Sequence, residues 1–329
     1  MSERKVLMTI WLNQLGYQDY ELTMASEDAS FRRYFRMHCD GETFIVMDAP
    51  PEKESCETFV AIAKQFRSIR LSAPEILKAD MSQGFLLMTD FGDTLYLDIL
   101  TQESHASLYG DAMLAILQMQ TKLDTSKLPV YNEQLLVEEM DLFQEWFLNH
   151  LLGIELNQQQ QTMWQTSKDL LLQNALEQPQ IFVHRDFHSR NLMKLENNNP
   201  GILDFQDAVK GPLTYDLVSL LRDCYIDWPQ PRVDQLAIEY YEFVKLKELT
   251  DVTVVKFLRW FNLMGVQRHL KAIGIFSRLK IRDGKKQFLA DIPRTLEYIR
   301  QVSSDEMSMA GLYTLLNELG LSYRIKSLL

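Results

Sequence analysis

The stretch that decides the fold runs Ile181-Phe-Val-His-Arg-Asp-Phe-His-Ser-Arg-Asn191, and a second stretch, Gly201-Ile-Leu-Asp-Phe205, completes it. The apolar beginning of the first stretch predicts a short strand, and the polar residues behind it predict a loop. The second stretch predicts another short strand, and an Asn-rich turn joins the two. We therefore expect Asp186, Asn191 and Asp204 to converge.

These three side chains have the chemistry that transfer of a phosphoryl group needs. Such transfer requires a group beside the attacking hydroxyl and oxygen atoms that hold a metal ion on the nucleotide phosphates. Asp186 suits the first role because a carboxylate can accept the hydroxyl proton. Asn191 and Asp204 offer oxygen ligands, which Mg²⁺ prefers. The full pattern His-x-Asp-x-x-x-x-Asn, followed by a strand that ends in Asp-Phe, is far more specific than a lone His-x-Asp.

Two other interpretations of the same residues are weaker. The three polar residues could be a turn former, a cap and a strand-end acid that share no function. His184 and His188 stand four residues apart like a pair of zinc ligands, but that pattern needs a helix and a Glu directly after the first His. Arg185 occupies that position. We therefore favour phosphoryl transfer.

The rest of the chain divides into two parts. Up to about residue 90, expected helices at 4–16 and 52–70 alternate with two β-hairpins, and Asp40-Gly41 is the turn signal of the first hairpin. From residue 91 onward long helices dominate, at 103–122, 133–150, 158–177, 213–226, 231–247, 251–273 and 284–300. Asp216, near the start of one of them, is expected to hold the loop in place. We predict an α+β fold with a β-rich N-terminal lobe, residues 1–90, and a larger helical lobe, residues 91–329.

Composition narrows the choice of partners. The formal net charge is −11, which argues against binding to nucleic acid. The three cysteines are far apart in the sequence, so neither a disulfide framework nor a cysteine zinc site is expected. The beginning of the chain has no apolar signal core, and no apolar run approaches the length of a membrane span. We expect a cytoplasmic protein with no membrane partner.

At the catalytic-type loop and the Asp-Phe strand end, the sequence resembles the aminoglycoside phosphotransferase/choline kinase superfamily. Four further runs are similar to the bacterial N-acetylmuramate/N-acetylglucosamine anomeric kinases: Asp28-Ala-Ser-Phe-Arg-Arg-Tyr-Phe-Arg36, Met47-Asp-Ala-Pro-Pro51, Leu220-Leu-Arg-Asp-Cys-Tyr225 and Gly265-Val-Gln-Arg-His-Leu-Lys-Ala-Ile-Gly-Ile-Phe276. The resemblance implies a two-lobed protein-kinase-like fold. It also implies ATP-dependent phosphorylation of the C1 hydroxyl of an amino sugar in cell-wall recycling.

The resemblance also implies a role for each matched position. Asp186 would be the catalytic base, and Asn191 and Asp204 would bind Mg²⁺. The nucleotide would meet the 26–33 turn and the junction of the lobes, at Ser30, Arg32, Arg33, Met88 and Asp90. The amino sugar would meet a pocket that includes His188, Arg222, Asp223, Arg268 and His269. ATP and Mg²⁺ are the implied cofactors.

Two features depart from the pattern of this superfamily. The turn expected to cover the phosphates has no glycine, and Glu27 would repel phosphate unless it points away. The strand Thr43-Phe-Ile-Val-Met-Asp48 has no Lys at the usual position that pairs with the nucleotide phosphates. Arg32, Arg33 or Lys53 would have to supply that charge.

Two alternatives therefore stay open. One is a kinase of another small alcohol, such as an aminoglycoside, choline or homoserine. The other is a pseudokinase that binds nucleotide and serves as an interaction module, which the missing Lys and the glycine-poor turn motivate. The complete set of Asp186, Asn191 and Asp204 favours an enzyme, and the candidate arginines in the sugar pocket favour an anionic sugar.

Overall fold

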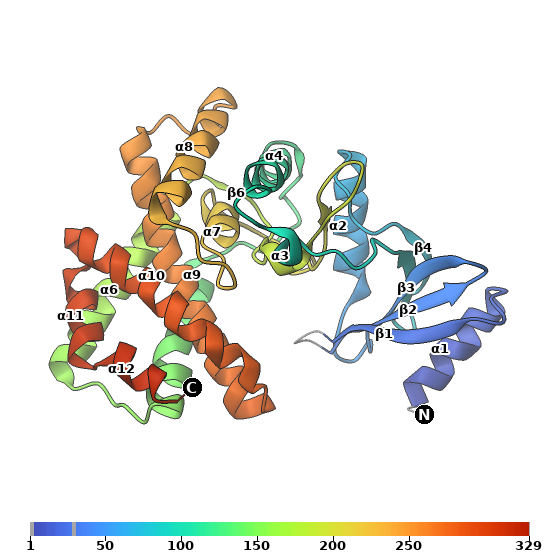
Figure 1. Cartoon of the computed structure of the whole chain (residues 1–329), viewed down its shortest axis with the longest axis horizontal. Coiled ribbons are helices and arrows are strands. Elements are labelled where there is room, and N and C mark those ends of the chain that lie inside the picture. The colour runs from blue at the N-terminus through green and yellow to red at the C-terminus, as the bar shows by residue number, and fades with distance from the viewer. Residues whose placement is uncertain (1–2, 28–30, 329) are drawn as a thin grey trace. The chain divides into compact units, whose positions relative to one another are not determined.

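The computed structural model describes residues 3–27 and 31–328 of the chain. The chain forms two compact units, each assembled from two segments. Unit 1 comprises Met1–Asp111 and Arg190–Gln206, and unit 2 comprises Ala112–Ser189 and Asp207–Leu329. The chain first passes from unit 1 to unit 2 within helix α4 (His105–Lys122). Figure 1 labels the elements of both units along the chain.

Unit 1 is built on a five-stranded sheet in the order β1-β2-β3-β5-β4. Its strands are β1 (Glu21–Glu27), β2 (Arg33–Cys39), β3 (Glu42–Asp48), β4 (Ile76–Asp80) and β5 (Phe85–Thr89). All neighbouring strands are antiparallel. The predicted turn between β2 and β3 is confirmed, because Asp40 and Gly41 have φ angles of 53° and 81°. Both lie in the left-handed region that a two-residue hairpin turn requires.

One face of this sheet is covered by helix α1 (Glu3–Gln14), as Figure 1 shows. The helix buries Met8, Trp11 and Leu12 against strand residues that include Phe35 and Phe85. Trp11 and Phe85 lie with their ring centroids 5.7 Å apart. The helix predicted at 4–16 is confirmed, but its predicted apolar face is wrong. Trp11 is buried as expected, whereas Val6, Leu7 and Ile10 are exposed and Met8 and Leu12 pack in their place.

Four further elements complete unit 1. Helix α2 (Cys56–Ser68) begins at Ser55, whose side chain accepts a hydrogen bond of 3.2 Å from the Glu57 N–H. Helix α3 (Tyr96–Ile99) follows the sheet, and the short strands β7 (Leu192–Met193) and β8 (Gly201–Ile202) pair antiparallel. The predicted neighbourhood of the strands at 181–183 and 201–205 is therefore wrong. Strand β8 pairs with β7 across the Asn-rich turn, and residues 180–183 pair with residues 209–212.

Unit 2 is mostly helical. It contains α5 (Glu133–Leu142), the π-helix η1 (Phe143–Leu151), α6 (Gln158–Leu176), α7 (Tyr215–Leu221), α8 (Gln230–Leu246), α9 (Val254–Asp283), α10 (Ile292–Asp305), α11 (Ala310–Glu318) and α12 (Leu321–Lys326). Strands β6 (Gln180–Val183) and β9 (Val209–Pro212) form an antiparallel pair. The 3₁₀ helices η3 (Lys286–Asp291) and η4 (Met307–Met309) join the last helices, and η2 (Ser189–Asn191) spans the passage from unit 2 to unit 1.

Helix α9 is the central element of unit 2, and it packs against α5, η1, α6, α7, α8 and α10. Its 30 residues end at Gly284, whose φ of 71° is the left-handed conformation that commonly terminates a helix. The sequence predicted an end near residue 273 and a new helix from 284. The structure instead extends α9 to Asp283 and starts α10 at Ile292. Of the described helices, none is both long enough and apolar enough to cross a membrane.

Candidate active site

A pocket in unit 1 collects most of the residues predicted to bind nucleotide and metal. It has a volume of about 280 Å³. The sheet contributes Ala25, Tyr34, Arg36, Ile45 and Met88, the segment after β5 contributes Asp90 to Asp93, and the β7–β8 region contributes Asn191, Met193 and Leu203 to Phe205. The structure therefore brings Met88, Asp90, Asn191 and Asp204 to one cavity.

The end of strand β8 sets the position of Asp204. Its φ of 60° lies in the left-handed region, which a residue other than glycine adopts at a cost of about 1 kcal/mol. The Leu203 N–H donates to the Asn191 carbonyl at 3.0 Å, so the two segments are tied together. The next ring, Phe205, is buried against Phe59 of α2 at a centroid distance of 4.6 Å. Both residues of the Asp-Phe pair line the pocket, and the packing of the Phe205 ring on Phe59 and Phe66 holds the pair in place.

The donor set around Asp204 fits a magnesium ion that arrives with a nucleotide. The Asn191 amide donates to Oδ2 of Asp204 at 3.3 Å, and the Gln206 amide donates to Oδ1 at 2.6 Å. Among the described residues, no three His, Cys, Asp or Glu side chains gather as metal ligands. Mg²⁺ does not need such a cage, because it commonly binds one or two protein oxygens together with phosphate and water.

Asp90 is held by Arg36, a residue that the sequence analysis did not single out. The guanidinium donates to both carboxylate oxygens of Asp90, at 2.6 Å and 3.1 Å, and to the Gly92 carbonyl at 2.9 Å. It also forms an ion pair with Asp93. Burial tends to raise the pKa of Asp90, but hydrogen bonds from Arg36 and the Gly92 N–H outweigh it and lower the pKa. Arg36 therefore fixes the segment that lines the pocket behind β5.

The residues predicted to meet the phosphates are partly engaged elsewhere. Ser30 lies outside the described residues. Arg32 is buried and pairs with Glu54 at 2.8 Å. Arg33 pairs with Asp48, a fully buried carboxylate that also accepts from Arg4 Nε at 3.0 Å. The third candidate for the missing lysine charge, Lys53, has its ammonium 5.3 Å from the centre of the Phe31 ring.

The loop that carries Asp186 lies in unit 2 directly after strand β6. Asp216, at the start of α7, accepts hydrogen bonds from the His184 N–H at 2.7 Å and the Arg185 N–H at 3.0 Å. The predicted role of Asp216 in holding this loop is confirmed. Arg185 has a φ of 78°, a conformation that persists only where its surroundings fix it. The Ser219 hydroxyl supplies a further hydrogen bond to the Arg185 carbonyl at 3.3 Å.

The charges around Asp186 keep its carboxylate ionised. Burial alone raises the pKa of such a group, but Lys271, His188, Arg268 and Arg185 together outweigh burial and lower the pKa of Asp186. An ionised carboxylate with low proton affinity can accept a hydrogen bond from a hydroxyl and orient it.

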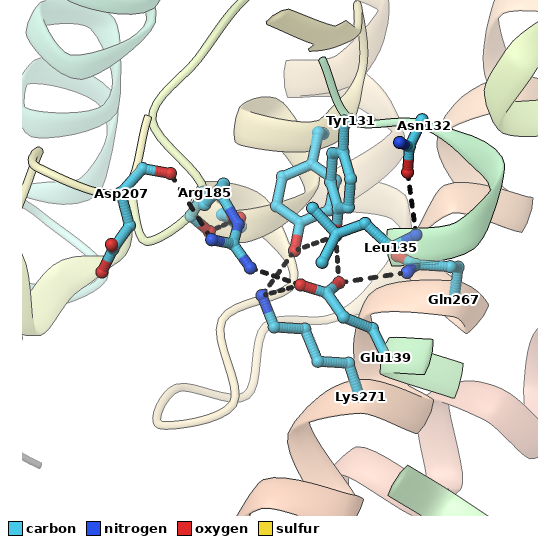
Figure 2. A network of polar contacts seen from close by, with 10 residues as sticks. Tyr131, Asn132, Leu135, Glu139, Arg185, Asp207, Gln267 and Lys271 are labelled. Carbon is cyan, nitrogen blue, oxygen red and sulfur yellow. Dashed lines mark hydrogen bonds and ion pairs between the residues drawn. The ribbon is translucent and has the colours of Figure 1, made fainter. Parts of the chain in front are cut away.

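Arg185, which precedes Asp186 in the loop, belongs to a buried network centred on Glu139 of α5, shown in Figure 2. The Glu139 carboxylate pairs with Arg185 and with Lys271, the latter at 3.1 Å. The Tyr131 hydroxyl donates to the same carboxylate, and the Gln267 amide donates to it at 3.5 Å. Burial raises the pKa of Glu139, but the two cations and the tyrosine outweigh it and lower the pKa. Glu139 therefore carries the negative charge that holds both cations.

The residues predicted to bind the sugar all lie in unit 2, but they have different surroundings. Asp223 accepts hydrogen bonds from the Ser189 N–H at 2.9 Å and the Tyr225 N–H at 3.0 Å, so it holds the end of the loop. His188 packs edge-on against Tyr225, with 5.5 Å between ring centroids. His269 hydrogen-bonds the Arg222 carbonyl at 2.9 Å.

Arg222 and Arg268 are both buried, at 2% and 6% exposed. The Arg222 guanidinium donates to Asn262 Oδ1 at 2.6 Å and lies 4.9 Å from the centre of the Phe261 ring. The Arg222 side chain packs closely against Gly265, because a Cβ at residue 265 would lie 3.0 Å from Nη1. Burial lowers the pKa of Arg222 to about 10. Arg222 is thus enclosed by α7 and α9.

A family model described as phosphotransferase enzyme family matches residues 21–251. The chain belongs to this family. The match begins at β1 and includes Asp186, Asn191 and Asp204. It supports a small-molecule kinase that transfers a phosphoryl group to an alcohol, which agrees with the resemblance seen in the sequence.

Curated relatives in this family cover nearly the whole chain. A protein from Neisseria meningitidis serogroup B named N-acetylmuramate/N-acetylglucosamine kinase is 42% identical over 324 residues, which cover 96% of each chain. A protein of the same name from Pseudomonas putida is 44% identical and covers 91% of this chain and 88% of its own.

Solved structures show the same fold at low sequence identity. An ADP-bound aminoglycoside phosphotransferase, APH(2'')-Ib, has a TM-score of 0.58 at 15% identity and covers 89% of this chain and 97% of its own. The choline kinase LicA from Streptococcus pneumoniae has a TM-score of 0.60 at 10% identity, and the match covers 91% of this chain and 100% of LicA. The predicted protein-kinase-like α+β fold is confirmed.

Sequence reasoning missed Arg36, Glu139 and Lys271. One feature of the sequence could have identified Arg36 as a pocket residue. Strand alternation places it on the same face of β2 as Tyr34, which also lines the pocket. Glu139 and Lys271 are charged residues on helices predicted to be amphipathic, and nothing in their spacing distinguishes them from surface charges. Their partners become apparent only once α5 and α9 pack together.

Proposed function

We propose that the protein is an ATP-dependent kinase that phosphorylates the anomeric C1 hydroxyl of N-acetylmuramate and N-acetylglucosamine. The observation that carries this proposal is the 42% identity, over 96% of both chains, to a relative named for these two sugars. The loop with Asp186 and the pocket with Asn191 and Asp204 support the same reaction. Unit 1 would hold the nucleotide, and unit 2 would hold the sugar.

Each part of the site has a role in this proposal. Asp186 orients the C1 hydroxyl and accepts its proton late in the transfer. Asn191 and Asp204 hold Mg²⁺, which neutralises charge on the nucleotide phosphates when it is bound. Met88 and Asp90 belong to the wall of the nucleotide pocket. The predicted assignment of Arg32 to the phosphates would require exchange of its Glu54 ion pair for phosphate.

The test is a coupled assay with MgATP and four acceptors: N-acetylmuramate, N-acetylglucosamine, an aminoglycoside and choline. We expect turnover with the two amino sugars, and phosphorus NMR should place the phosphate on C1. Phosphate on C6 would contradict the anomeric assignment, and turnover of the aminoglycoside or choline alone would favour the other alcohols. Nucleotide binding without turnover of any acceptor would favour the interaction module.

Asp186→Asn provides the matched control for the chemistry. The amide keeps the shape of the carboxylate but cannot accept the proton, so kcat should fall about 10²- to 10⁴-fold. Nucleotide affinity, measured by calorimetry, should stay within about threefold of wild type, because Asp186 does not line the pocket of unit 1. A variant with near wild-type kcat would remove Asp186 from this role.

A further inference from the structure

Arg268 is a buried cation that forms no ion pair within the described part of the chain. It lies in the middle of α9 and is 6% exposed. Its Nη1 approaches the Cys224 sulfur at 4.0 Å, which is at the limit of a hydrogen bond. In the ranges 3–27 and 31–328, no carboxylate lies within ion-pair distance of it. Asp186 and Asp223 stabilise its charge from a longer distance. A buried guanidinium that forms no ion pair can still receive an anion on its N–H donors, which gives it the character of an anion site.

Three other cations in the interior of unit 2 each form an ion pair with a carboxylate. Arg185 and Lys271 share the carboxylate of Glu139. Lys168 pairs with Asp141 at 2.6 Å. Among the other described cations of this unit, Arg222 resembles Arg268 in being buried with no carboxylate, but an amide and an aromatic ring surround it. The absence of a carboxylate at Arg268 is therefore not a general property of the unit.

The position of Arg268 connects it with the reacting loop. Cys224, its neighbour, follows Asp223, whose carboxylate accepts from both the N–H and the hydroxyl of Ser189, at 2.9 Å and 2.5 Å. Ser189 is three residues beyond Asp186 in the same loop. Arg268 is also one of the cations that lower the pKa of Asp186, after burial, Lys271 and His188. Arg222 is not among those cations.

We propose that Arg268 binds an acidic substituent of the sugar and thereby sets the preference for a sugar acid over its neutral counterpart. This inference rests on the proposed function. N-acetylmuramate differs from N-acetylglucosamine by a lactyl ether that ends in a carboxylate. A guanidinium can bind a carboxylate with two parallel hydrogen bonds, which gives both affinity and orientation. N-acetylglucosamine has no charge to place there, so its binding uses Arg268 much less.

An alternative role for Arg268 is contact with the transferred phosphoryl group. That group is the same for both sugars, so a loss of Arg268 would then lower both reactions to the same extent. Recognition of the lactyl carboxylate lowers one of them selectively. The ratio of kcat/KM for the two sugars separates the alternatives, and general damage to the fold cancels in this ratio.

The experiment compares wild type with Arg268→Met in the full chain, with MgATP and each sugar. We expect kcat/KM for N-acetylmuramate to fall about 10- to 100-fold, the loss typical of a bidentate charged contact, and that for N-acetylglucosamine to change less than about threefold. Arg268→Lys keeps the positive charge but loses the two parallel N–H donors of the guanidinium. The ratio of kcat/KM for the two sugars should therefore lie between those of wild type and Arg268→Met. Equal losses with the two sugars would overturn the role of Arg268.

Arg294→Met is the matched control. Arg294 also contacts Cys224, through a hydrogen bond of 2.8 Å to its carbonyl, but it is partly exposed and lies 3.7 Å from Asp291. The sugar ratio should stay as in wild type. A ratio that falls as in Arg268→Met would show a general field of positive charge and would contradict a specific site. A wild-type enzyme that phosphorylates neither sugar would instead overturn the proposed function.

Discussion

Glu139 links two cations that come from distant parts of the sequence. Arg185 belongs to the loop, and Lys271 belongs to α9. The neutral, nearly isosteric Glu139→Gln would leave both positive charges without their counter-charge in a buried position. We expect the free energy of unfolding to fall by about 3 kcal/mol or more, and kcat to fall at least about tenfold because Arg185 adjoins Asp186. Urea unfolding and steady-state kinetics, at a temperature where the variant is folded, would measure both.

Tyr131→Phe is the control for this network. It removes one hydrogen bond to Glu139 and retains all the charges. The free energy of unfolding should fall by only about 1 kcal/mol, and kcat should remain close to wild type. If both variants lowered kcat equally, the charge of Glu139 would not be the feature that matters.

His269 should make the stability of the fold depend on pH, and its pKa determines the direction of that dependence. It is 1% exposed, and its ring stacks on Tyr298 at a centroid distance of 5.0 Å. Burial, together with the charges of Arg268 and Arg222, lowers the pKa of His269 to about 3. The hydrogen bond to the Arg222 carbonyl raises the pKa but does not offset these effects. The unfolded chain therefore binds one more proton than the folded chain between about pH 6.5 and pH 3. Stability from His269 is present above this range and decreases as the pH falls through it.

His269→Gln tests that sign. The glutamine amide can still donate to the Arg222 carbonyl, but it does not titrate. The loss of unfolding free energy between pH 7 and pH 5 should become smaller than in wild type, by up to about 1.4 kcal/mol per pH unit, the value for one proton. Urea unfolding curves at several pH values would give both slopes. Identical slopes would show that the ring does not resist protonation in the fold.

At the scale of elements, the sequence predicted most long helices and both hairpins of unit 1, because their apolar spacing and turn residues are local signals. Asp40-Gly41 adopts the predicted turn, and the boundaries of α6 and α8 lie within a residue or two of those expected. The end of α9 was predicted ten residues too early. Residues 274–283 carry several charges, and packing with neighbouring helices extends the helix past them.

The placement of Asn191 and Asp204 at one pocket was predictable, because the two residues are close in sequence and follow one pattern. Arg36 and Asp90 are 54 residues apart, and their contact depends on how strands pair. Sequence patterns specify such strand pairing only weakly, because each strand shows the same alternation.

Gly274 controls how closely α9 approaches α5. A Cβ at this position would lie 2.5 Å from the backbone carbon of Leu142, which cannot move as a flexible side chain can. Gly274→Ala should therefore destabilise the protein by about 1–3 kcal/mol, the range for overpacking. The midpoint of urea unfolding would report this.

Gly110→Ala in α4 is the matched helical control, because nothing lies within 4 Å of a Cβ at that position. It should raise stability by about 0.5–1 kcal/mol through helix propensity. A stabilising effect of Gly274→Ala, similar to that of Gly110→Ala, would contradict the close approach of the two helices.

At the scale of the whole molecule, the two compact units carry different sets of site residues. Unit 1 holds Arg36, Asp90, Asn191 and Asp204 around one pocket. Unit 2 holds Asp186 with the residues predicted to bind sugar. Substitutions confined to one unit should therefore alter the kinetic constants of one substrate more than those of the other.

Arg36→Met tests this separation in unit 1. Its removal leaves the Asp90 carboxylate, whose side chain is 3% exposed, without its cation and loosens the segment behind β5. We expect the KM for ATP to rise about tenfold, a loss that corresponds to one charged hydrogen bond, while the KM for either sugar changes less than about threefold. Arg67→Met is the control, because Arg67 and its partner Glu75 are both exposed and such a pair contributes little. Initial rates with each substrate varied in turn would give the four constants. A sugar KM that rises in step with that for ATP would mean that Arg36 acts beyond the nucleotide pocket, and the two units would then not divide binding between them.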